Sequence, residues 1–160
     1  MKKILFIILV CFIAISCSHD FMYADETANI LGTDMGECVE KKQVSCEAIG
    51  EWFICETYEF KNKAKTTPAH NSLYRTDWSW VAQDWLKLPI CSNSEINNIV
   101  FNYSGSDKAK AISREMEEIN ASGCGYYSFL AKPSIEDPRY LIMCIFDTNK
   151  SKLYVVDAHL

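Results

Sequence analysis

The sequence predicts a small α+β domain, stabilised by disulfides, in which an antiparallel sheet packs against one helix. Three observations lead to this prediction. Three apolar segments rich in β-forming residues follow one another near the C-terminus. An amphipathic segment with clear helix boundaries precedes them. Six cysteines lie beyond residue 24, and an even number is typical of small exported domains with disulfides.

Residues 1–24 have the features of a secretory signal peptide. Two lysines precede an apolar segment over 4–15, which is too short to span a bilayer comfortably. One candidate cleavage site is the segment Ala14–Cys17, which resembles a bacterial lipoprotein box. Cleavage there would remove residues 1–16 and leave Cys17 lipidated. The other is an ordinary cleavage after Ala24. Both predict an extracytoplasmic protein, which is periplasmic, anchored to a membrane as a lipoprotein, or secreted.

The chain after the signal begins with an arm and a hairpin. Residues 25–36 are polar with little periodicity, and we interpret them as a flexible arm before one globular domain over 37–160. Residues 43–60 alternate as two strands that turn at Gly50 and Glu51. This register places Cys46 opposite Cys55 and predicts a disulfide between them, with Cys38 as the main competitor for either thiol.

A Trp-rich helix is expected over 76–88. Thr76 or Asp77 caps it, and Pro89 ends it. Helical spacing places one set of mainly apolar residues on the same face: Trp78, Val81, Ala82, Trp85 and Leu88. Trp80 falls among polar residues on the other face. A strand over 74–80 is the alternative, and it would place Trp78 and Trp80 on one face.

The C-terminal half predicts a strand, a helix and three further strands. A short strand over 98–103 precedes a helix over 107–121, which Ser106 or Asp107 caps and Gly123 ends. The segments 126–131, 140–146 and 153–157 then form an antiparallel meander. The middle segment carries Cys144 and is apolar throughout, as a strand buried on both faces would be.

The candidate binding residues lie on the polar face of the expected Trp-rich helix. They are Trp80, Asp84 and Lys87. An exposed tryptophan has no role in folding, whereas aromatic anchors carry much of the binding energy of interfaces. We therefore expect a non-enzymatic exported protein that binds another protein, such as an inhibitor, an immunity-type factor or an envelope component.

Two other functions stay open. Asp157 and His159 lie on the same face of a strand, so a small secreted hydrolase would use this carboxylate and imidazole, with His70 as a further candidate. The chain lacks the G-x-S-x-G motif that would supply a serine nucleophile. An apolar-ligand carrier would instead line a pocket with its Trp residues.

Charge and cysteine spacing restrict the partners. From Asp25 onward, 14 Lys and Arg stand against 20 Asp and Glu, a net charge of −6 with no basic stripe, so nucleic acid is a poor candidate. The sequence contains no C-x-x-C motif and so predicts no metal site, and no other motif indicates a cofactor. No feature of the sequence indicates the oligomeric state. The cysteines assigned to disulfides, with open connectivity, are Cys38, Cys46, Cys55, Cys91, Cys124 and Cys144.

Overall fold

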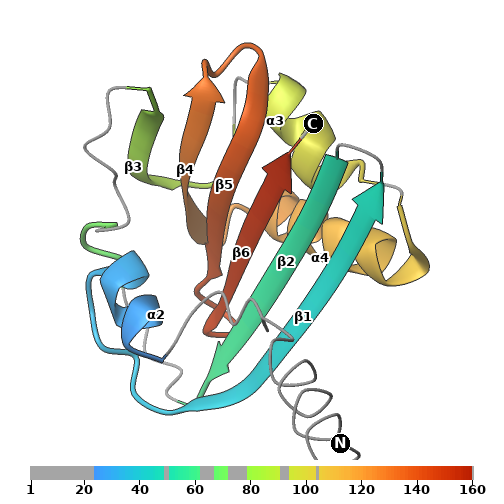
Figure 1. Cartoon of the computed structure of the whole chain (residues 1–160). Helices are drawn as coiled ribbons and strands as arrows, with labels where there is room; N and C mark the ends of the chain where they lie inside the picture. Colours follow the sequence, from blue (N-terminus) through green and yellow to red (C-terminus); the bar gives the residue numbers. More distant parts are fainter. Residues whose placement is uncertain are drawn as a thin grey trace, which may run out of the picture.

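The computed structural model describes residues 24–48, 51–61, 67–71, 79–90, 94–103 and 105–159. At its centre is a six-stranded sheet in the order β1-β2-β6-β5-β4-β3, with every neighbouring pair antiparallel (Figure 1). The strands are β1 (Cys38–Ala48), β2 (Glu51–Phe60), β3 (Val81–Lys87), β4 (Gly125–Pro133), β5 (Pro138–Asp147) and β6 (Lys152–His159). The helices are α2 (Ala24–Leu31), α3 (Ser94–Phe101) and α4 (Asp107–Ser122). The α+β class with an antiparallel sheet is confirmed.

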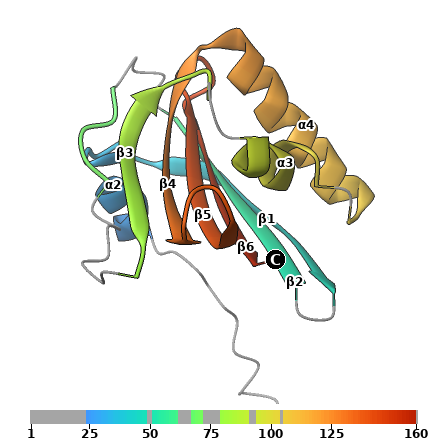
Figure 2. The same cartoon turned by 90° about the horizontal axis from the view of Figure 1, so that it is seen from above.

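The sheet separates two apolar cores. Helices α3 and α4 lie on one face, and α2 lies on the other (Figure 2). Because side chains alternate along a strand, neighbouring residues of β6 serve different cores. Tyr154 and Val156 face the helix pair, in what we call the α3–α4 core. Leu153 and Val155 face the single helix, in what we call the α2 core.

The C-terminal meander is confirmed. β4 pairs with β5, and β5 pairs with β6, so the strand that carries Cys144 is the middle one. Met143 and Ile145 of this strand are buried in the α3–α4 core, while Cys144 and Phe146 are buried in the α2 core. Burial on both faces is why this segment has no alternation of apolar and polar residues.

Helix α4 is also confirmed, with both of its predicted ends. Ser106 is the N-cap, and its side-chain oxygen accepts a hydrogen bond from the backbone N–H of Ala109 at 3.2 Å. Gly123 is the C-cap in the left-handed conformation, with φ of 66°, and its N–H donates to the carbonyl of Asn120. The buried residues of α4 are Ala109, Ser113, Met116 and Ile119.

The N-terminal hairpin forms, but its predicted register is wrong. Ala48 pairs with Glu51, so the chain reverses one residue earlier than expected. Moving the turn by one residue moves every partner by two. Cys46 therefore lies opposite Phe53, and Cys55 lies opposite Val44.

The expected disulfide framework is not seen among the described cysteines. Cys38, Cys46, Cys55, Cys124 and Cys144 are free thiols, and Cys91 lies outside the described residues. Strand alternation explains part of this result, because it places Cys55 in the α3–α4 core and Cys144 in the α2 core. Thiols on opposite faces of a sheet cannot reach each other.

The described part of the Trp-rich segment is strand β3, not a helix. A bulge between Gln83 and Leu86 inserts one extra residue opposite β4. The bulge breaks the alternation of side chains, so Trp85 does not continue the period of two. The apolar residues then recur at a spacing that resembles a helix. Trp78 and the rest of 72–78 lie outside the described residues.

The predicted strand over 98–103 is likewise wrong, because residues 94–101 form helix α3. Ile96, Ile99 and Val100 are buried, at the spacing of one helix face. Ile96 is separated from Ile99 by two asparagines, and the apolar run over 99–101 on its own is short enough to resemble a strand.

The segment interpreted as a flexible arm contains helix α2. Ile30 and Leu31 are fully buried in the α2 core, and the indole Nε1 of Trp85 donates to the carbonyl oxygen of Ile30 at 3.0 Å. The signal peptide and the lipidation of Cys17 fall outside the described residues. In the ranges that the structure describes, no helix has the length and apolarity needed to cross a membrane.

Candidate functional site

Three strand ends meet at one end of the sheet face that carries α2. Trp52 at the start of β2 lies opposite His159 at the end of β6, and Tyr140 near the start of β5 lies opposite His159 from the other side. Residues that pair directly across antiparallel strands point to the same face. The three side chains therefore form a row across β2, β6 and β5.

These side chains and Trp80 form an aromatic cluster, which we define as Trp52, Trp80, Tyr140 and His159. The His159 ring stacks on Tyr140 with centroids 4.1 Å apart and planes 13° apart, and it lies 4.3 Å from Trp52. Trp80 meets Tyr140 edge to face at 6.4 Å. Tyr140 is 36% exposed, whereas eight of the 14 Phe, Tyr and Trp side chains in the described ranges are buried. Such a surface presents ring faces and edges to solvent at fixed positions.

Two charged groups border the aromatic cluster. The ammonium of Lys132 lies 5.8 Å from the ring centroid of Trp80, in cation–π geometry. The indole Nε1 of Trp52 donates to the Oδ1 atom of Asp157 at 3.3 Å. The cluster therefore combines one cation and one carboxylate with fixed apolar rings.

Helix α2 covers the other end of this sheet face. The residues that it buries include Tyr58, Phe60 and Leu153, which lie at the far ends of β2 and β6 from Trp52 and His159. Figure 1 shows α2 at the lower left of the sheet and the C-terminal end of β6 near the top. Within the described part of the chain, no helix packs over the aromatic cluster.

The structure separates the three predicted binding residues. Trp80 belongs to the aromatic cluster. Asp84 serves a different purpose, because its Oδ2 atom pairs with His70 Nδ1 at 2.8 Å and its Oδ1 atom accepts the backbone N–H of Trp85 at 2.8 Å. The spacing that would bring Trp80, Asp84 and Lys87 together on a helix spreads them along a strand.

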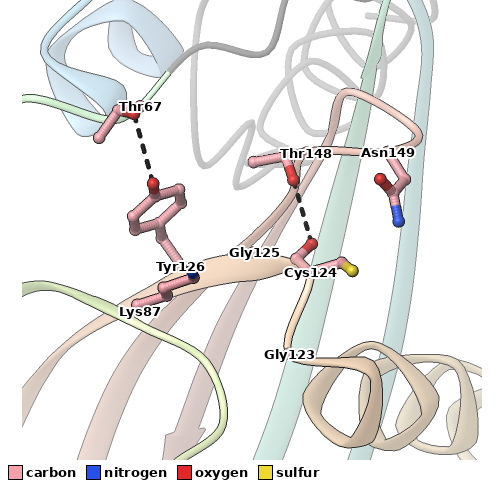
Figure 3. A pocket seen from close by; sticks show the side chains of 8 residues that line it. All are labelled: Thr67, Lys87, Gly123, Cys124, Gly125, Tyr126, Thr148 and Asn149. Atoms are coloured by element: carbon pink, nitrogen blue, oxygen red, sulfur yellow. Dashed lines mark hydrogen bonds between the residues drawn. The ribbon is translucent and has the colours of Figure 1, made fainter.

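Lys87 lines a pocket at the opposite end of the sheet, shown in Figure 3. The pocket has a volume of about 330 Å³. It is framed by two hydrogen bonds. One joins the hydroxyl oxygens of Thr67 and Tyr126, which are 3.3 Å apart, and in the other Thr148 Oγ1 donates to the Cys124 carbonyl at 3.2 Å. Its lining residues are Thr67, Lys87, Gly123, Cys124, Gly125, Tyr126, Thr148 and Asn149.

The three hydrolase candidates are not brought into one site. His70 pairs with Asp84 beside a cavity of about 390 Å³ against α2, away from His159. Asp157 accepts a hydrogen bond from an indole, and the imidazole of His159 lies between two aromatic rings. Neither Asp157 nor His159 lines the pocket at Lys87 or the cavity at His70. The described residues also contain no group of three or more His, Cys, Asp or Glu side chains that could hold a metal.

Sequence reasoning missed Trp52 and Tyr140 as site residues. Tyr140 begins the long apolar run of β5 and Trp52 is the second residue of β2, so in the sequence both look like ordinary strand residues. The signal that could have found them is the pairing of β2 with β6, which joins residues about a hundred positions apart. Such non-local pairing leaves no trace in local periodicity.

Comparisons with protein-family models, with curated proteins and with solved structures find no match to this chain.

Proposed function

We propose that this protein is a non-enzymatic binding protein that contacts another protein through the aromatic cluster. The observation that carries the proposal is the exposed Tyr140, held between His159 and Trp80 on the part of the sheet that α2 leaves open. Aromatic residues at the centre of an interface often contribute 2 kcal/mol or more. Tyr and Trp also lose little conformational entropy on binding, since few torsions define them.

The chemistry of the cluster favours a protein partner over a small apolar ligand. A carrier needs a concave apolar cavity, whereas these rings lie on a sheet face and line neither the pocket at Lys87 nor the cavity at His70. A protein surface can pair an acidic group with Lys132 and a donor with Asp157 while it buries the rings. An inhibitor, an immunity-type factor and an envelope component would all use such a surface.

The proposed location is outside the cytoplasm, and it is supported by the composition of residues 1–24. If the lipoprotein box is used, Cys17→Ser should release the protein from membranes or leave it unprocessed. Fractionation and N-terminal sequencing of the native protein measure this. An N-terminus at Asp25 would exclude the lipid anchor and leave a secreted or periplasmic protein.

The binding proposal is tested with a matched pair of variants. The native protein is used to capture a partner from an envelope extract, and its affinity for the purified partner is then measured by calorimetry. Tyr140→Ala should weaken binding about 30-fold, which corresponds to about 2 kcal/mol. Leu86→Ala removes an exposed apolar side chain from β3, and it should leave the affinity unchanged. Equal affinities for Tyr140→Ala and the unmodified protein would reject the aromatic cluster as the interface.

A further inference from the structure

Strand β1 forms one edge of the sheet (Figure 1). It pairs with β2, and no strand in the described part of the chain pairs with its other side. Residues 40 to 48 pair with β2 without interruption, and a bulge between Cys38 and Glu40 ends this regular stretch. An edge strand of this length, with no proline, presents backbone N–H and C=O groups to an incoming strand.

The opposite edge of the sheet is less suited to pairing. β3 has seven residues, and a bulge between Gln83 and Leu86 interrupts them. A bulge bends and twists a strand, so a flat partner cannot follow it. The two edges therefore differ, and β1 is the one with a regular ladder of backbone groups.

We propose that β1 pairs with β1 of a second copy of this chain, antiparallel, so that two sheets join into one. A two-fold axis perpendicular to the sheet places one residue of β1 directly opposite the same residue of the second copy. If the whole regular stretch from Glu40 to Ala48 pairs with itself, that residue is Val44, the middle of the stretch.

The charges of β1 select the same register. With Val44 on the axis, Lys41 of one copy lies opposite Glu47 of the other, and the symmetry makes this contact twice. Both residues are exposed. Opposite charges that face each other across strands stabilise the pairing, and like charges destabilise it. A register with Gln43 or Ser45 on the axis loses both contacts, so strand length and charge agree on one arrangement.

Sedimentation velocity of the purified native protein tests the proposal. The protein should sediment as a dimer, and Glu47→Lys should weaken dimerisation about tenfold or more, because two attractive contacts become repulsive. The double variant Lys41→Glu with Glu47→Lys reverses both charges and should restore the dimer. A monomer at every concentration tested, or a dimer that Glu47→Lys leaves unchanged, would overturn the proposal.

A cross-linking experiment tests the register without a change of charge at Lys41, which also pairs with the buried Glu56 of its own chain. Val44→Cys is made together with Cys55→Ala, because Cys55 lies directly opposite Val44 on β2 and its thiol would compete for the new sulfur. The new cysteine should form a disulfide between copies on mild oxidation, because its Cβ atoms would face each other across the axis. Ser45→Cys is the control: it lies opposite Gln43 of the second copy, so its own sulfurs are too far apart. Peptide mapping identifies the bond. A link at position 45 but not at position 44 would reject the register.

Discussion

The thiol of Cys144 is buried in the α2 core, where Asn71 Nδ2 approaches the sulfur to 3.8 Å. Burial raises the pKa of this thiol to about 12, against the smaller opposite effect of hydrogen bonds from Asn71 and Ser128. Burial also raises the pKa of Cys55 in the other core. Both thiols therefore stay neutral in the folded protein into the alkaline range.

This burial predicts a loss of stability at high pH. The thiol of Cys144 ionises near pH 9 when unfolded but near pH 12 when folded, so the unfolded state holds fewer protons between these values. The free energy of unfolding must then fall as pH rises from about 9, by about 1.4 kcal/mol per pH unit for one such thiol. Cys144→Ala should reduce the slope by that amount, as measured by urea denaturation between pH 9 and 11. If Cys144→Ala kept the same slope as the unmodified protein, the prediction would be contradicted.

At the scale of elements, an ion pair joins α4 to the sheet. Lys152 of β6 places its Nζ atom 3.1 Å from each carboxylate oxygen of Glu115, and Lys150 Nζ lies 3.4 Å from one of them. The side chain of Lys152 is only 13% exposed, so its ammonium depends on Glu115 for compensation. Glu115→Ala should lower the free energy of unfolding by about 1–3 kcal/mol.

The control for this variant lies on the same helix. Glu117 is exposed, and Glu117→Ala should change the free energy of unfolding by less than about 0.5 kcal/mol. Chemical denaturation of both variants separates a specific contact from a general effect of removing acidic residues from α4. Similar losses in the two variants would count against the ion pair.

Helix α2 provides a second prediction at this scale. Ile30 is 0% exposed and packs in the α2 core, so Ile30→Ala should cost about 2–5 kcal/mol through lost burial and the cavity left behind. Val39→Ala removes a side chain that is 54% exposed, and it should cost less than about 0.5 kcal/mol. If Ile30→Ala is as stable as Val39→Ala, the segment before β1 contributes nothing to the core.

The helices and strands that could be predicted from the sequence are those whose own residues show where they lie, through caps or an apolar pattern. Helix α4 carries its own cap residues, Ser106 and Gly123, and β5 is apolar along its length. Strand β3 could not be predicted, because the bulge at Gln83 removes the alternation that marks a strand. Helix α3 has eight residues, and so short a segment shows too few turns for its period to be recognised.

At the scale of the whole molecule, the candidate site depends on pairings between distant segments. The aromatic cluster draws on the start of β2, the residue before β3, the start of β5 and the end of β6. The sequence predicts Trp80 as a binding residue and offers His159 only for the alternative hydrolase, but their common surface follows only from the order of strands in the sheet. The pairing of β2 with β6 is set by burial on both faces, and burial depends on the complete fold.

The whole fold also predicts how the protein responds to a reducing agent. Two apolar cores, one on each face of the sheet, stabilise the chain while its described cysteines are free thiols. The melting temperature should therefore be the same with and without dithiothreitol. Three disulfides would instead contribute about 2–4 kcal/mol each, and their loss would lower the melting temperature by more than about 10 °C for a domain of this size. Thiol counting in the denatured, unreduced protein provides the second measurement, and five or more reactive thiols per chain are expected from the described cysteines. A fall in melting temperature of that size, together with no reactive thiols, would restore the disulfide framework that the cysteine count first suggested.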